Sequence, residues 1–333
     1  MDCWKTIAVT VALVVLLANS IVVGAPKNPI TVGCVCMNMG ADSNVLAYEG
    51  LSAYAQKQGW RLLHSDCQGE IAKVSLNIIN YVNQRVDAIV VVTSEKTIID
   101  RGVAEAEKKG IPVFLVDTEN TRNTIVNATT NCWAMGAYLG SQVVDRIRAT
   151  KGDKGPHYVA IIGMDDLYVH RQRQQMMEAV FNSPENPDFE VLVSDSVRVD
   201  NWQTASYDLA KAWITQYGKK LSAILGTWDG ISWGICRAIV DSGYTKDDIF
   251  TMSIDGSTQT YDLIRRGQPF VGVIAQDFSG WATAVGETIQ AVVVEGKAPK
   301  AVIPASRTIY VPYKWVDEAN VPAKGEEDKL FAE

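Results

Sequence analysis

The 333-residue sequence has little that would support a metal site, a nucleic-acid surface or a common hydrolase. Its three histidines are scattered, and its six cysteines show no metal-ligand spacing. Lysine and arginine cluster only as short pairs, and the net charge of −7 argues against nucleic acid as a partner. No His-Glu-x-x-His or phosphate-loop motif occurs. We therefore expect a binding protein without a metal or other cofactor, not an enzyme.

The cysteines allow two interpretations. Cys34 and Cys36 leave the same face of an extended segment, so they are poorly placed to bridge each other. Cys36 and Cys67 end two neighbouring predicted strands, so a disulfide between them and burial as free thiols both fit the sequence. Five cysteines follow the N-terminal segment, an odd number, so at least one thiol stays free.

Residues 1–25 have the pattern of a secretory signal peptide. Lys5 precedes the apolar run Ile7–Ala18, which is shorter than the ~20 residues that cross a bilayer. Cleavage after Ser20 and cleavage after Ala25 both fit, and the first is favoured because a proline follows the second. The rest of the chain has no second long apolar run. We expect a freely soluble protein that is exported from the cytoplasm.

Apolar strand patterns alternate with helical patterns along the rest of the chain. Ile30–Cys36, Ala88–Val92 and Pro112–Val116 are almost continuously apolar, which favours parallel strands covered on both faces. Val45–Gly59 shows helical spacing and ends at a glycine. The part from His157 onward repeats this plan. The sequence therefore predicts an α/β fold with two doubly wound parallel-sheet lobes.

Five short segments in a fixed order carry a further signal. They are Lys109–Asp117 (KGIPVFLVD), Asn131 with Gly136 and Gly140, Ile224–Asp229 (ILGTWD) with Gly234, Ile254–Gly256 (IDG), and Ile274–Gln276 (IAQ) with Gly280. Together they resemble the type I periplasmic sugar-binding proteins of ABC transporters, in the ribose- and galactose-binding class. The resemblance implies two lobes, joined by a three-crossover hinge, that close on a small ligand. It divides the chain into an N-terminal lobe of 28–129 and 277–303, a C-terminal lobe of 130–276 and 304–322, and a mobile tail of 323–333.

The resemblance also implies which residues face the ligand. Asp117, Asp255 and Gln276 match polar cleft positions of the family, while Thr118 and Trp228 replace a common arginine and a common asparagine. Within 163–173, which matches a segment carrying a ligand-binding arginine, Arg171 is chosen over His170 and Arg173. The full expected set is Asp42, Ser43, Asn44, Asp117, Thr118, Arg171, Asn201, Trp202, Trp228, Asp255 and Gln276.

This set suits a ligand rich in hydroxyl groups. Carboxylates accept hydroxyl hydrogen bonds, arginine donates several, and tryptophan rings cover weakly polar C–H faces. Asp229 is instead expected to cap the helix that follows it.

The implied function is capture of a sugar, polyol or related carbohydrate and its delivery to an ABC permease. A sensor that presents the ligand to a chemoreceptor or a histidine kinase is the alternative. The fold also serves as the effector domain of lac-repressor-family regulators, but those require N-terminal DNA-binding helices where this chain has a leader.

Overall fold

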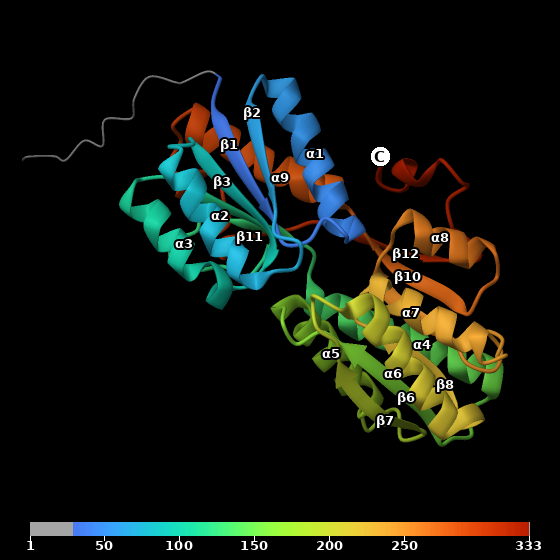
Figure 1. The fold of residues 1–333 in the computed structure, drawn as a ribbon. Helices are drawn as coiled ribbons and strands as arrows, with labels where there is room; N and C mark the ends of the chain where they lie inside the picture. Colours follow the sequence, from blue (N-terminus) through green and yellow to red (C-terminus); the bar gives the residue numbers. More distant parts are fainter. Residues whose placement is uncertain (1–28, 333) are drawn as a thin grey trace, which may run out of the picture.

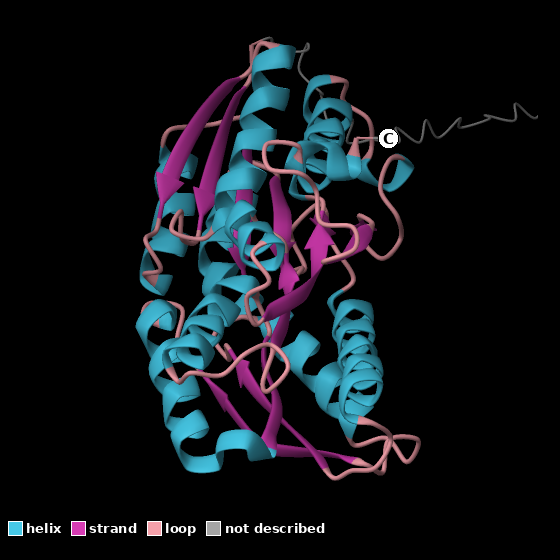
Figure 2. Cartoon of the chain, turned by 90° about the vertical axis from the view of Figure 1, so that its right-hand side faces the viewer, coloured by secondary structure: helices cyan, strands magenta, loops and turns pink. Residues whose placement is uncertain are grey.

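The structure is a computed structural model that describes residues 29–332 and arranges them in two α/β lobes (Figure 1 and Figure 2). The predicted fold class, two lobes built on parallel sheets, is confirmed. The predicted signal peptide, residues 1–25, lies outside the described residues. Within 29–332, no helix combines the length and the apolar character that a membrane span requires.

The first lobe is built on a fully parallel sheet with the strand order β11-β5-β4-β3-β1-β2. Its central strands are buried almost throughout because helices cover both faces. Helices α1 and α9 pack on one face, and α2 and α3 pack on the other. The bounds are β1 (Thr31–Cys36), α1 (Asp42–Gln58), β2 (Arg61–Asp66), α2 (Ile71–Asn83), β3 (Ala88–Ser94), α3 (Lys96–Lys108), β4 (Val113–Thr118), β5 (Asn127–Thr129), α9 (Phe278–Ile289) and β11 (Thr308–Tyr310).

The second lobe contains the sheets β7-β6-β8 and β12-β10-β9, which a parallel bridge between Ala223 and Phe250 joins. All its strand pairs are parallel except β10 with β12. Helices α4 and α5 pack against each other, as do α6 and α7. The bounds are α4 (Cys132–Lys151), β6 (His157–Gly163), α5 (Tyr168–Phe181), β7 (Phe189–Ser196), α6 (Trp202–Tyr217), β8 (Leu221–Gly226), α7 (Asp229–Asp241), β9 (Thr251–Asp255), α8 (Thr258–Arg265), β10 (Phe270–Gln276) and β12 (Tyr313–Asp317).

The chain passes between the lobes after β5, after β10 and after β11. The last crossing differs from the predicted division, which gave 304–322 to the second lobe. Thr308 pairs with Asn127 and Tyr310 with Thr129, so β11 extends the sheet of the first lobe. Such a short strand gives no periodicity from which its sheet could be predicted.

The C-terminal segment, expected to be a mobile tail, packs on the second lobe (Figure 1). The Arg265 guanidinium pairs with Glu327, and Lys314 Nζ donates to the Leu330 carbonyl oxygen at 2.8 Å. Phe331 joins the apolar cluster around Tyr261 and adds to this contact. The charged composition of this segment predicts an exposed tail and gives no sign of these contacts.

The cysteines from Cys34 onward are all buried free thiols. Cys34 and Cys36 share one face of β1, with 3.8 Å between their sulfur atoms. Cys67 lies in the apolar cluster on the opposite face of the sheet from Cys36. The disulfide considered between Cys36 and Cys67 is therefore not formed, because their side chains point away from each other.

Helices α4 and α5 come into close backbone contact at Gly136. A Cβ atom at this position would overlap the carbonyl oxygen of Arg173 and would lie 2.9 Å from the Arg173 Cα atom. Because both clashing atoms belong to the backbone, no side-chain rotation relieves the overlap. Gly136 therefore sets the position of α5 and of the residues it presents.

We predict that Gly136→Ala destabilises the protein by about 1–3 kcal/mol, since the overpacking outweighs the gain in helix propensity. Ser141→Ala, on the exposed side of the same helix, should change stability by less than about 0.5 kcal/mol. Urea unfolding measures both. Equal stability of Gly136→Ala and the native protein would contradict this packing.

Candidate ligand-binding cleft

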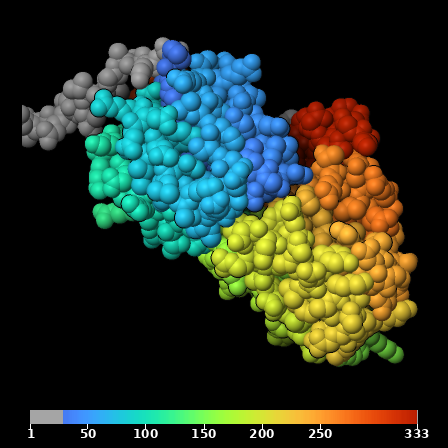
Figure 3. Space-filling model, viewed as in Figure 1, coloured from blue at the N-terminus to red at the C-terminus, as the bar shows by residue number. Residues whose placement is uncertain are grey.

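A cavity lies between the lobes, at the carboxyl ends of the parallel strands. Ligands of open α/β sheets bind at this edge. The space-filling view shows the two lobes in direct contact (Figure 3). The first lobe lines the cavity with Met37, Asn38, Ala41, Ser43, Asn44, Thr93 and Asp117, and the second with Met164, Leu167, Val169, His170, Arg173, Val199, Trp202, Trp228 and Asp255.

Three of the lining residues have a backbone conformation that side chains rarely adopt. The φ angles are 54° at Thr93, 46° at Asp117 and 122° at Asp255. Each such conformation costs on the order of 1–3 kcal/mol and persists only where the surrounding structure enforces it. All three residues lie at or next to the end of a strand, so the strain turns their side chains toward the cleft.

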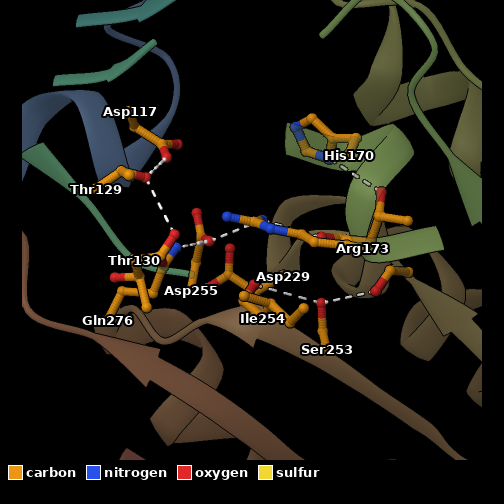
Figure 4. A network of polar contacts seen from close by, with 12 residues as sticks. Asp117, Thr129, Thr130, His170, Arg173, Asp229, Ser253, Ile254, Asp255 and Gln276 are labelled. Atoms are coloured by element: carbon orange, nitrogen blue, oxygen red, sulfur yellow. Dashed lines mark hydrogen bonds and ion pairs between the residues drawn. The ribbon is translucent and has the colours of Figure 1, made fainter. Parts of the chain in front are cut away.

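Arg173 is the central cation of the cleft (Figure 4). Its side chain is 2% exposed, and its Nη1 donates to Asp255 Oδ1 at 3.1 Å and to the Thr227 carbonyl oxygen at 3.0 Å. Gln276 Nε2 donates to the same Asp255 oxygen at 2.6 Å. The Arg173 Nε atom is buried and has no hydrogen-bond partner within the described structure.

The two carboxylates of the cavity come from different lobes. Asp117 Oδ1 accepts a hydrogen bond from the Thr129 hydroxyl at 2.6 Å. Burial raises the pKa of Asp117, while Arg173 and Thr129 act in the opposite direction. Burial also raises the pKa of Asp255, to about 6, although the charge of Arg173 opposes the shift. Both groups are therefore poorly solvated and depend on partners within the cleft.

His170 lines the cavity as a neutral imidazole. Burial lowers its pKa well below the usual value, and the charges of Arg173 and Arg171 lower it further. Its Nδ1 lies 3.0 Å from the Thr227 hydroxyl. His170 thus adds a polar group but no positive charge.

An aromatic wall closes one side of the cavity. Trp202 and Trp228 are both buried, with ring centroids 4.5 Å apart and planes at 63°. Trp233 packs behind them, 6.1 Å from Trp202. Rings held edge to face in this way cannot turn independently, so the wall is rigid.

Six of the predicted ligand-binding residues line the cavity, and five do not. Those that line it are Ser43, Asn44, Asp117, Trp202, Trp228 and Asp255. Gln276 lies behind the cavity and holds Asp255. Asp42 begins α1 and is half-buried beside Ser257 of the second lobe. The Asn201 side chain accepts a hydrogen bond from the Arg198 backbone N–H at 3.3 Å, and it does not reach the cavity.

Thr118 is a structural residue. Its hydroxyl donates to the Val116 carbonyl oxygen at 2.8 Å and accepts from the Ser94 N–H at 3.1 Å. These bonds join the ends of β3 and β4, and they leave the side chain fully buried away from the cleft.

Arg171 was the wrong choice within 163–173 for a residue facing the cavity. Its guanidinium is exposed, donates to the Asp165 carbonyl oxygen and pairs with Glu95 of the other lobe at 2.9 Å. His170 and Arg173 are three residues apart and share the buried face of α5, while Arg171 lies off that face. The helical spacing of Val169, Arg173 and Met177 was the signal that could have identified Arg173.

Asp229 was predicted to cap the helix that follows it, α7, but it does not have this role. Helix α7 begins at Asp229 itself, and the carboxylate accepts from the Ser257 N–H at 3.1 Å and the Thr260 hydroxyl at 2.8 Å. It therefore satisfies the first turn of α8. Burial, together with the charge of the nearby Asp255, raises its pKa to about 8.

Two lobes whose strand ends converge on one polar cavity define a bilobal ligand-binding protein. A family model described as a periplasmic binding protein domain matches residues 32–298. The chain therefore belongs to the periplasmic binding protein family, and the predicted resemblance is confirmed. The family is one of binding proteins, which also confirms the prediction of a binding protein over an enzyme.

Individual relatives are distant. The chain is 26% identical over 231 residues to a xylitol-binding protein of Mycolicibacterium smegmatis, a match that covers 69% of this chain and 62% of that protein. It is 20% identical over 244 residues to the ribose import binding protein of Bacillus subtilis, covering 72% and 74%. A solute-binding protein of an ABC transporter from Agrobacterium vitis, solved with bound allitol, has a TM-score of 0.75 at 21% identity and covers 91% and 98%. The structural likeness is one of fold.

We predict that Arg173→Met destabilises the protein by about 3 kcal/mol or more, because it leaves the buried Asp255 without its cation. Arg171→Met removes an exposed ion pair, so it should cost less than about 1 kcal/mol. Urea unfolding of the ligand-free variants gives both values. Equal losses in the two variants would contradict the assignment of Arg173 to the buried position.

The raised pKa of Asp229 predicts a pH-dependent stability. The folded protein keeps a proton up to about pH 8 that the unfolded chain releases above about pH 4, so stability falls as the pH rises between these values. Asp229→Asn keeps an acceptor for Ser257 and Thr260, and it should weaken this fall. Urea unfolding at about pH 5 and about pH 8 tests it, with the exposed Asp100→Asn as control. The same fall in Asp229→Asn and in the native protein would contradict the shift.

Proposed function

We propose that this chain is a periplasmic solute receptor that captures a sugar, a polyol or a related small carbohydrate and delivers it to an ABC permease. The observation that carries the proposal is the convergence of Asp117 from one lobe with Arg173 and Asp255 from the other, beside the Trp202 and Trp228 wall. Residues 1–25, as a cleaved leader, would export the protein. No nucleic acid takes part, and the receptor acts as a monomer.

The chemistry of the cavity suits such a ligand. Carboxylates accept hydrogen bonds from hydroxyl groups, and the guanidinium of Arg173 donates them to an oxygen. Charged groups make each of these bonds worth about 1.5–3 kcal/mol. The tryptophan rings match the C–H face that a carbohydrate presents between its hydroxyl groups.

The relatives support the same class of ligand. The proteins named above bind xylitol, ribose and allitol, which share a short carbon chain bearing a hydroxyl group on most atoms. Because the identities are low, we carry over the class of compound and not a particular member.

Closure of the cleft would couple binding to delivery. A ligand that touches Asp117 and Asp255 at once binds the closed form better than the open form, so it shifts the population toward closure. The Glu95–Arg171 ion pair forms only when the lobes meet, and it adds a contact that does not touch the ligand. A permease that recognises both lobes together can then distinguish loaded from empty receptor.

A thermal-shift panel tests the ligand class. We expect at least one compound among xylitol, ribitol, allitol, D-ribose and D-allose to raise the melting temperature by several degrees, since about 100-fold excess over Kd adds ~2.7 kcal/mol. Asp255→Ala should abolish the shift. A shift with an amino acid and with no carbohydrate would contradict the proposal.

Delivery is tested by crosslinking tagged receptor in the cell envelope with the ligand present. Recovery of an ABC permease is the expected result. Recovery of a chemoreceptor or a histidine kinase in its place would contradict the transport role and favour sensing.

A further inference from the structure

The charges that line the cleft do not balance. Asp117 and Asp255 are carboxylates, while Arg173 is the one permanent cation among the described lining residues. Arg173 makes its ion pair with Asp255. Asp117 has a hydrogen bond from Thr129 but no ion-pair partner in the described part of the chain. One buried carboxylate is therefore left without a cation.

Nearby groups do not supply the missing charge. His170 is neutral, because burial lowers the pKa of its imidazole well below the usual value. Arg171 lies outside the cavity and pairs with Glu95. Thr118, directly after Asp117, is uncharged, and its hydroxyl is bonded to the backbone. Arg173, already paired with Asp255, offsets only part of the cost of burying Asp117, so the charge on Asp117 is left for a cation in the cavity to meet.

Asn44 gives a second, independent indication that the ligand donates hydrogen bonds to the first lobe. Asn44 is 2% exposed and lines the cavity on the same lobe as Asp117, yet its Oδ1 atom has no hydrogen-bond partner within 29–332. An unpaired acceptor in a buried wall costs free energy unless a ligand donates to it. The first lobe thus presents a surplus of acceptors to the cavity.

We infer that the ligand carries a protonated amine, as an amino sugar or an amino polyol does, and that Asp117 binds this group. An ammonium group has three donors, no acceptor and a positive charge, so it matches a wall with one extra carboxylate and a free amide oxygen. A hydroxyl group offers one donor and no charge. The inference rests on the proposed function, because it specifies the ligand of the same cleft. The hydroxyl-bearing part of the ligand would lie against Arg173, Asp255 and the tryptophan wall.

The test compares compounds that differ only in one amine. The pairs are D-glucosamine with D-glucose, 1-amino-1-deoxy-D-glucitol with D-glucitol, 1-amino-1-deoxyribitol with ribitol, and an inositol monoamine with the inositol. Calorimetric titration of the purified protein near pH 7 gives both affinities of each pair. We expect the amine to bind about tenfold or more tightly than its hydroxyl partner in at least one pair.

Substitution of Asp117 tests whether this residue causes the preference for the amine. Asp117→Asn keeps the shape and one acceptor, so it should remove most of the preference for the amine over its hydroxyl partner. Asp100→Asn makes the same change on the exposed side of α3 and should keep the preference. A melting curve checks that the variants fold, and the comparison on the native protein needs no variant.

The outcomes separate this inference from the proposed function. If hydroxyl compounds bind and no amine exceeds its partner, the amine inference is wrong and the sugar or polyol receptor stands. If Asp117→Asn keeps the full preference, Asp117 is not the group that binds the amine. If neither member of any pair binds, the amine inference fails, and the panel of sugars and polyols described above decides the proposed function separately.

Discussion

The buried ion pair between Arg173 and Asp255 is the interaction on which the cleft depends. Removing a guanidinium from water costs several kcal/mol, and the cost is recovered only when the partners are held in good geometry. The fold provides that geometry from three sides. Gly136 lets α5 approach α4 closely enough to place Arg173, the end of β9 turns Asp255 toward it, and Gln276 holds the carboxylate from behind.

The first lobe brings the complementary half of the site. Its parallel strands end at the cleft, so Asp117 reaches the same cavity from the opposite side. The strained backbone at Thr93 and Asp117 fixes these side chains before a ligand arrives, which lowers the entropy that binding costs. The chain crosses between the lobes three times, so three segments join them beside the cleft.

Much of this arrangement can be predicted from the sequence. The alternation of apolar strands and helices specified two parallel-sheet lobes, and strand ends such as Asp117 and Asp255 fall at the cleft in any open α/β sheet. Side chains on loops and helix starts were harder to predict. Arg171 and Arg173 have the same chemistry, and only the direction in which α5 faces separates them. The match of Thr118 to a family position also gave no sign that its hydroxyl group bonds to the backbone of Val116 and Ser94.

Contacts between residues far apart in the chain could not be predicted from local sequence patterns. The sheet that β11 joins is decided by its contact with β5, some 180 residues earlier in the chain. The docking of the C-terminal segment through Arg265 and Glu327 is likewise a tertiary contact that composition does not reveal. The sequence also left open whether Cys36 and Cys67 form a disulfide, because adjacent strand ends can present their side chains to the same face or to opposite faces of the sheet.

The central claim is that one small ligand bridges both lobes around Arg173 and closes the cleft. Small-angle X-ray scattering with a saturating ligand from the binding panel tests it most directly. We expect the radius of gyration of the native protein to fall when the ligand binds. An unchanged radius of gyration in a protein shown by calorimetry to be saturated would contradict the claim.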